Sequence, residues 1–222
     1  MMPKKVLILC DYDDTIFRTD DFLARVLTAL GQLGQSDLAA EISRDVATAR
    51  AELGTSADYK IGAKLAPFAD ELARILAPNN AALIWSDAQT FARTLPSAAR
   101  LTIFTRGDEI YQRLKFAGTM FEKSTKFSHE IFSEKDKIAK FLRDVTIGKS
   151  LYANNFYYNK NFYNQLIFID NDARYFTGFD RLKRAGIDAR GILLHRRNPR
   201  FMPRETLPGG VEIVVDFSEI KI

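Results

Sequence analysis

Cysteine and long apolar runs are both scarce in this chain of 222 residues. Cys10 is the single cysteine, which excludes an intrachain disulfide and a metal site built from several cysteines. No apolar run approaches the roughly 20 residues that a membrane-spanning helix needs, so we expect no membrane association. Only five apolar residues separate Lys5 from Asp11, too few for the core of a signal peptide. These absences together favour a cytoplasmic location.

An excess of charge of one sign is also missing. The 32 basic residues nearly balance the 28 acidic ones, and the formal net charge is +4. This mild positive charge suits a phosphorylated substrate and also suits nucleic acid. The one dense basic run covers residues 195–200, with Arg204 shortly after it. We interpret this run as a solvated loop after a strand rather than as a nucleic-acid patch, so a nucleic-acid partner is not expected.

The boundary between residues 6–10 and the acids that follow is the most informative stretch. Five apolar, strand-favouring residues stop at Asp11, Asp13 and Asp14. A short apolar run of this kind predicts a buried strand of a parallel sheet, and ligands bind at the carboxyl ends of such strands. Asp11 and Asp13 project to the same side while the chain stays extended. Their repulsion is costly unless a cation or a proton compensates it; Mg²⁺ would do so, and it commonly accompanies phosphate. The alternative is an acidic turn in which Asp14 or Thr15 caps a helix.

Strand and helix patterns alternate through most of the chain. The length accommodates one α/β domain with a modest insertion, and the 46% hydrophobic content is that of an ordinary globular protein. Helical spacing of apolar residues separates the short apolar runs, which predicts a doubly wound, mainly parallel, Rossmann-like sheet. The further predicted strands are residues 101–105, 129–132, 166–170, 191–194 and 211–217.

Residues 20–86 form the exception to this alternation. Apolar residues recur there at three- and four-residue spacing, and no strand signal appears between Thr15 and Leu101. We interpret this block as a small α-helical cap inserted into a core made of residues 1–19 and 87–222. A second exception is the segment 152–163, which is rich in Asn and aromatic residues. We expect a loop whose aromatics pack on the body; the alternatives are a helix extension and a partner-binding aromatic patch, including one that stacks on nucleic-acid bases.

The acidic stretch resembles the first motif of the haloacid dehalogenase (HAD) superfamily. Asp11-Tyr12-Asp13-Asp14-Thr15 matches the pattern D-x-D-x-T after an apolar strand. The second motif of that family is a strand ending in Thr or Ser, and Thr105 fits it. The stretch from Thr105 to Gly118 is similar to the T-x-G-D…Q…K…G sequence of many HAD phosphatases whose lid follows the first motif; besides these two residues it comprises Arg106, Gly107, Asp108, Gln112 and Lys115.

The third and fourth motifs follow in order. The third is a Lys at the start of a helix, and Ser133-Glu134-Lys135-Asp136 is similar to the family's EKD form, so Lys135 is the first choice and Lys137 the second. The fourth is an acid pair after a strand, which Asp170 and Asp172 supply. Asn171 separates them, a departure from the usual adjacent pair that leaves the role of Asp172 open between direct ligation, action through water and helix capping.

The resemblance implies phosphoryl transfer to a carboxylate. Asp11 would attack phosphorus, and Asp13 would protonate the leaving group and then help to activate water. Thr105 and Lys135 would hold the phosphate. The backbone N–H groups of Tyr12 and Arg106 would add donors to its oxygens.

The same resemblance implies a metal site and a reaction class. Mg²⁺ would bind a side-chain oxygen of Asp11, the backbone carbonyl of Asp13 and a side-chain oxygen of Asp170, with Asp172 as a further candidate ligand. The expected function is therefore a Mg²⁺-dependent phosphatase of a small phosphorylated metabolite. Two alternatives remain open at this point: a phosphotransferase that uses an acceptor other than water, and a non-catalytic binding or regulatory protein on the same fold.

Overall fold

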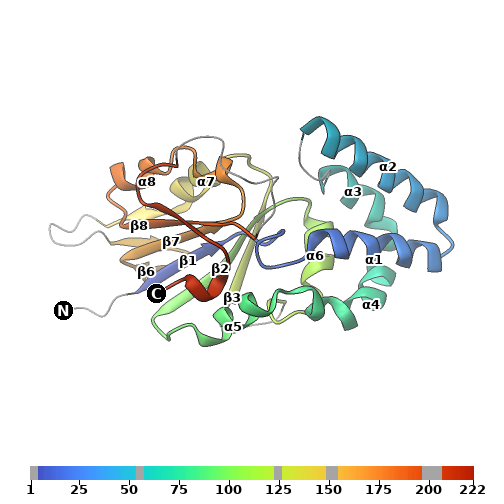
Figure 1. The fold of residues 1–222 in the computed structure, drawn as a ribbon, viewed down its shortest axis with the longest axis horizontal. Coiled ribbons are helices and arrows are strands. Elements are labelled where there is room, and N and C mark those ends of the chain that lie inside the picture. Colours follow the sequence, from blue (N-terminus) through green and yellow to red (C-terminus); the bar gives the residue numbers. More distant parts are fainter. Residues whose placement is uncertain (1–4, 54–57, 123–126, 149–154, 197–206) are drawn as a thin grey trace.

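Six parallel strands form the central sheet of the computed structural model, in the order β3-β2-β1-β7-β8-β9 (Figure 1). The structure describes residues 5–53, 58–122, 127–148, 155–196 and 207–222. All six predicted strands are found, so the predicted fold class is confirmed. Their bounds are β1 (Val6–Cys10), β2 (Ala99–Arg106), β3 (Phe127–Phe132), β7 (Gln165–Asp170), β8 (Ala189–Leu194) and β9 (Val211–Val214).

The strand β1 lies at the centre of the sheet, paired with β2 on one side and β7 on the other. The chain builds β2 and β3 outward from β1 and then returns to build β7, β8 and β9 in the opposite direction. The β1–β7 pair is therefore the point where the strand order reverses, and in open α/β sheets ligands bind at the carboxyl ends of such a pair.

Both faces of the sheet are covered, which explains the uninterrupted apolar sequence of β1. Ile8 and Cys10 belong to one core and Leu7 and Leu9 to the other, because successive side chains of a strand point to opposite faces. Figure 1 shows α5 on one side of the sheet and α7 and α8 on the other. The bounds of these helices are α5 (Ser86–Thr94), α7 (Lys137–Asp144) and α8 (Asp180–Arg184), with 3-10 turns η3 (Ala173–Phe176) and η5 (Phe217–Glu219).

Helices occupy the chain between β1 and α5, where no strand was predicted. In Figure 1 they lie beside the carboxyl ends of the strands, together with α6 (Glu109–Phe116). The two connections to the sheet meet at a bridge between Phe17 and Ile84. The division into a cap of residues 20–86 and a separate core stays a prediction. The elements are α1 (Thr19–Gln32), α2 (Ser36–Leu53), α3 (Asp58–Leu65), η1 (Ala66–Phe68), α4 (Ala69–Asn80) and η2 (Ala81–Leu83).

The inserted helices pack closely on α6. The buried side-chain amide of Asn80 donates to the carbonyls of Leu114 at 2.8 Å and Ala117 at 2.9 Å. Gly118 has a φ of +73°, and a Cβ there would lie 1.9 Å from the carbonyl oxygen of Ala77. Glycine is thus required at this contact both for its backbone conformation and for the close approach of α4.

A small antiparallel sheet is the element that sequence reasoning missed. It consists of β4 (Thr146–Ile147), β5 (Phe156–Tyr158) and β6 (Asn161–Tyr163), so the loop predicted for 152–163 is wrong for residues 156–163, while 152–154 lie outside the described residues. Asn159 and Lys160 both have positive φ, which suits a two-residue hairpin turn. The predicted packing of aromatics on the body holds for Phe156, Tyr158 and Tyr163, all of which are buried.

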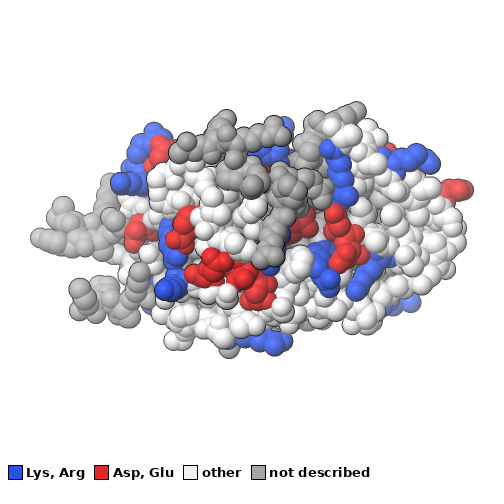
Figure 2. All heavy atoms as spheres, viewed as in Figure 1, with Lys and Arg blue, Asp and Glu red and all other residues white. Residues whose placement is uncertain are grey.

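Acidic and basic side chains are interspersed on the face drawn in Figure 2. Of the basic run, the described Arg196 is not part of a solvated loop: its side chain is 13% exposed and pairs with Asp87. Its Nε also donates to the carbonyl of Thr15 at 2.8 Å. The remainder of the run, residues 197–200 and Arg204, lies outside the described residues. No helix in the described part of the chain is long and apolar enough to cross a bilayer.

Candidate active site

Two buried carboxylates and one ammonium meet at the carboxyl ends of β1 and β7. The backbone N–H of Asp11 donates to the carbonyl of Ile169 at 2.9 Å, which holds Asp11 beside the end of β7. The Nζ of Lys137 lies 2.5 Å from Asp11 Oδ1 and 2.7 Å from Asp170 Oδ2. Both carboxylates therefore converge on one point at the strand-order reversal.

The lysine at this point is Lys137, whereas sequence reasoning placed Lys135 first. Lys135 is exposed, and Lys137 is 1% exposed. The reason is where α7 begins: Asp136 is its N-cap, with a side-chain oxygen that accepts from the N–H of Ala139 at 2.9 Å. The helix thus starts two residues later than predicted, and its first residue points into the site.

Burial controls the electrostatics of this cluster. It raises the pKa of Asp170 to about 7 and also raises that of Asp11, although the Lys137 charge opposes both shifts. Burial disfavours the Lys137 ammonium, but the charges of Asp11 and Asp170 outweigh it and hold the pKa of Lys137 well above its usual range. Two carboxylates against one ammonium leave an uncompensated negative charge, which a proton or a bound cation would balance.

The donor set fits a hard divalent cation through oxygen ligands. Asp11 and Asp170 are the two side chains that converge, and among the described residues no group of three acidic, His or Cys side chains is arranged around a metal position. A Mg²⁺ ion here would therefore complete its coordination with oxygen atoms of the backbone, of water or of a bound ligand. Mg²⁺ sites in proteins commonly have only one or two carboxylate ligands. Asp172 is placed differently: both of its oxygens accept from Arg174, and it caps η3.

Asp13 belongs to a separate charge pair. Its Oδ1 accepts from Lys115 Nζ at 2.5 Å and from Thr19 Oγ1 at 2.7 Å, and its Oδ2 accepts from Gln112 Nε2 at 2.7 Å. Burial raises the pKa of Asp13, but the Lys115 charge and these hydrogen bonds outweigh it, and the pKa lies below its ordinary value. Gln112 and Lys115 were noticed in the sequence as part of a pattern, without a role in the site.

The turn after Asp13 is tight. Asp14 adopts a φ of 55°, and its Oδ1 accepts from the N–H of Thr19 at 3.2 Å. Burial and the charges of Asp13 and Asp20 raise the pKa of Asp14 to about 6. Thr15 Oγ1 donates to Asp11 Oδ2 at 3.3 Å. Of the two residues considered as caps, Asp14 therefore contacts the N–H of the first residue of α1, and Thr15 contacts Asp11.

Thr105 is the penultimate residue of β2, which pairs with β1, and its side chain is fully buried. Its hydroxyl finds no hydrogen-bond partner among the described residues. Asp108 is the N-cap of α6, and its side chain accepts from the N–H groups of Ile110 and Tyr111. A buried hydroxyl without a partner is unfavourable unless a ligand supplies one, so Thr105 is a candidate ligand contact.

Tyr12 and Arg106, whose backbone N–H groups are predicted to bind phosphate, have side chains that contact other residues. The ring of Tyr12 is buried and stacks on Phe17, with centroids 4.9 Å apart. The guanidinium of Arg106 donates to the hydroxyl of Tyr175 at 3.4 Å, and the Lys137 ammonium lies 4.3 Å from the centre of the Tyr175 ring. Arg106 and Tyr175 therefore stand at the edge of the cluster. The phosphate-binding role of the two backbone N–H groups stays a prediction.

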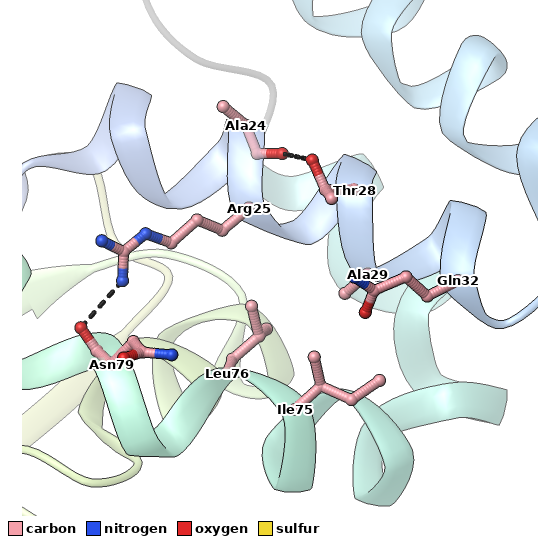
Figure 3. A pocket seen from close by; sticks show the side chains of 8 residues that line it. All are labelled: Ala24, Arg25, Thr28, Ala29, Gln32, Ile75, Leu76 and Asn79. Carbon is pink, nitrogen blue, oxygen red and sulfur yellow. Dashed lines mark hydrogen bonds between the residues drawn. The ribbon is translucent and has the colours of Figure 1, made fainter.

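A hollow of about 370 Å³ between α1 and α4 lies outside this cluster (Figure 3). In Figure 3 Arg25 reaches from α1 towards α4, where its Nη1 donates to the carbonyl of Asn79 at 2.8 Å. None of the described residues that line the hollow carries a carboxylate, so the acidic strand ends remain the candidate active site. Its lining residues are Ala24, Arg25, Thr28, Ala29, Gln32, Ile75, Leu76 and Asn79.

Comparison with known proteins identifies the class of fold. Neither a family model nor a curated protein matches the sequence. A solved structure from Burkholderia xenovorans LB400, described as haloacid dehalogenase-like, is 17% identical with a TM-score of 0.62, covering 99% of this chain and 100% of that one. A structure described as the HAD-hydrolase YfnB from Bacillus subtilis, bound to magnesium, is 16% identical with a TM-score of 0.51, covering 98% of this chain and 97% of that one. The chain therefore has the fold of HAD-like hydrolases, with a helical insertion after the first strand.

Proposed function

We propose that the protein is a Mg²⁺-dependent phosphatase that cleaves a small phosphate monoester through an aspartyl-phosphate on Asp11. The observation that carries this proposal is the Lys137 ammonium between Asp11 and Asp170, at the reversal point of the sheet. A second carboxylate, Asp13, is available beside it with a different set of partners. Acid–base chemistry and nucleophilic attack can then be divided between two residues.

Asp11 attacks the phosphorus, and the bond to the leaving oxygen breaks as the new P–O bond forms. Lys137 pairs with Asp11 and with the phosphoryl oxygens, and the buried hydroxyl of Thr105 donates to another of them. Asp11 and Asp170, with the backbone carbonyl of Asp13, would hold Mg²⁺, which when bound offsets the negative charge that the phosphate brings. Water then attacks the aspartyl-phosphate and releases inorganic phosphate.

Asp13 acts in both half-reactions. It gives a proton to the leaving oxygen in the first and accepts one from the attacking water in the second. The donors around Asp13 favour its ionised form, which is the form that the second half-reaction uses. In the first half-reaction it must hold a proton when the P–O bond breaks.

A dehalogenase would also use a carboxylate nucleophile. The structure favours the phosphatase because three side-chain donors hold Asp13 in place, and a halide leaving group has no use for a proton donor. Phosphotransfer to another acceptor would employ the same residues, so analysis of the products distinguishes it from hydrolysis. A purely binding role is disfavoured because buried ionisable groups with shifted pKa values, such as Asp11, Lys137 and Asp170, are typical of catalytic sites.

The test is a turnover screen of phosphorylated metabolites with and without Mg²⁺, using the Asp11→Asn variant as the control. Phosphate release that needs both Mg²⁺ and Asp11, together with borohydride trapping of an aspartyl-phosphate, is the expected result. A phosphorylated acceptor in place of free phosphate would point to the transferase. Turnover by Asp11→Asn close to that of the wild type would overturn the assignment of the nucleophile.

A further inference from the structure

We propose that Lys115 and Gln112 are positioning residues, which fix the carboxylate of Asp13 in the orientation needed for proton transfer to the leaving group. The inference rests on the proposed phosphatase function. It concerns a cluster that is distinct from the Lys137 pair, because Lys115 and Gln112 come from α6 and contact Asp13, while Lys137 comes from α7 and contacts Asp11 and Asp170.

Lys115 is buried completely, with no exposed surface. It occupies a helix whose other buried positions include Tyr111, Leu114 and Phe116, so a leucine or methionine would fill the same space without a charge. Placing an ammonium there requires a compensating partner. The carboxylate of Asp13, 2.5 Å from its Nζ, is that partner, and the ring of Tyr111 lies 4.2 Å below the charge.

Gln112 completes the hold on the other oxygen of Asp13. It lies one helical turn before Lys115, so both side chains leave α6 on the same face. The Gln112 amide donates to Oδ2, while Lys115 and Thr19 donate to Oδ1. Because both carboxylate oxygens of Asp13 accept hydrogen bonds, the carboxylate is restrained against rotation about its Cβ–Cγ bond.

Gly107 provides the space that Gln112 needs. A Cβ at this position would lie 2.6 Å from Gln112 Nε2 and 3.1 Å from its Cγ. The absence of a side chain at 107 therefore allows the amide to lie between the end of β2 and Asp13. This contact gives a physical reason for the spacing of Gly107, Gln112 and Lys115 in the sequence.

Orientation matters because proton transfer works over a narrow range of geometry. A donor must come within hydrogen-bond reach of the leaving oxygen, and small displacements lower the rate strongly. Lys115 pairs with Asp13, whereas Lys137 pairs with Asp11, so we expect loss of Lys115 to disturb the proton donor more than the attack by Asp11. Loss of Lys115 should thus slow esters with poor leaving groups most, because those esters need the proton as the bond breaks.

The experiment is a leaving-group series measured on Lys115→Met, Gln112→Leu and a control, Leu114→Met. The substrates run from aryl phosphates with acidic leaving groups to alkyl phosphates with basic ones. For Lys115→Met we expect kcat to fall about tenfold or more further on the alkyl esters than on the aryl esters, with little change in KM. Gln112→Leu should likewise make kcat fall more steeply as the leaving group becomes more basic. Leu114→Met should leave this dependence of kcat on the leaving group unaltered.

Each outcome has a distinct meaning. An equal loss across the series in both variants, with cooperative thermal unfolding retained, would overturn the positioning role. If Lys115→Met does not fold, Gln112→Leu alone decides whether the loss of kcat grows with the basicity of the leaving group or is equal across the series. If the wild-type protein hydrolyses no ester in the series and no aspartyl-phosphate is trapped, the proposed function itself is wrong, a result that the Lys115 variants cannot produce.

Discussion

Lys137 and Asp170 stand 33 positions apart in the sequence, and the Lys137 ammonium lies 2.7 Å from an Asp170 carboxylate oxygen. The pair connects the first residue of α7 to the last residue of β7. It also brings Asp11 into contact through the same ammonium. One cation thus gathers the two carboxylates that lie at the ends of adjacent strands.

Replacing Asp11 by Asn should remove the nucleophile with little change of shape. We expect turnover to fall about a thousandfold or more, because a neutral amide does not attack phosphorus. The amide oxygen can still accept from Lys137, and the amide nitrogen can donate to the Thr15 hydroxyl. The fold should therefore persist, which circular dichroism would verify. Substantial residual hydrolysis of p-nitrophenyl phosphate would contradict the prediction.

Lys137→Ala should lower turnover about a hundredfold or more, whereas Lys135→Ala should have little effect. Lys137 is buried against two carboxylates, and Lys135 is exposed. The two variants remove the same side chain from neighbouring positions, so Lys135→Ala is the matched control. Steady-state kinetics at saturating Mg²⁺ gives the comparison; similar losses in both would mean that the ion pair is unimportant for catalysis.

Asp170→Asn should weaken Mg²⁺ binding more than Asp172→Asn. Asp170 converges on the same point as Asp11, and Asp172 is engaged by Arg174 and caps η3, a task that Asn also performs. Calorimetric titration of each variant with Mg²⁺ measures the difference without relying on activity. The reverse order of affinities would identify Asp172 as the ligand.

Asp136→Ala should destabilise the protein by about 1 kcal/mol, because α7 loses its N-cap. Asp136→Asn should keep most of that stability. Burial raises the pKa of Asp136, but the N–H of Ala139 and the Arg181 side chain outweigh it, so the pKa is lowered. The charge therefore contributes stability above the ordinary pKa of about 3.8, and this contribution is lost as the pH falls through the lowered value.

Denaturant unfolding of the two Asp136 variants between pH 3 and pH 7 measures both effects. Asp136→Asn should show a smaller loss of stability on acidification than the wild type. Because Asp136 is 49% exposed and its Arg181 pair is near the surface, the charge effect should be well below the cap effect. A pH dependence identical to that of the wild type would show that the charge does not contribute.

Sequence reasoning succeeded where a single local signal fixes the structure. The apolar runs predicted all six strands. The signal is strongest in β1 and β7, because a strand buried on both faces leaves little room for polar residues, whereas β3 and β9 at the sheet edges are partly exposed. The lysine was misassigned by two positions because Lys135 was chosen from the resemblance to the EKD form. The start of α7 is instead set by Asp136, which caps the helix and makes Lys137 its first residue.

The roles of Gln112 and Lys115 could not be assigned from local pattern. Their partner Asp13 is about a hundred residues away, and the contact depends on how α6 docks against the first loop. The hairpin was missed for another reason. Its turn uses Asn159 and Lys160 at positive φ without glycine, so the usual turn signal was absent.

The contacts of Asn80 and Gly118 with their neighbours have a consequence for any opening of the protein. A swing of residues 20–86 alone would pull Asn80 from the carbonyls of Leu114 and Ala117 and separate α4 from α6. If α6 instead travels with those helices, it takes Gln112 and Lys115 away from Asp13. The movement that admits substrate would then also break the contacts that orient Asp13. In that case the protein could protonate a leaving group only after it has closed again.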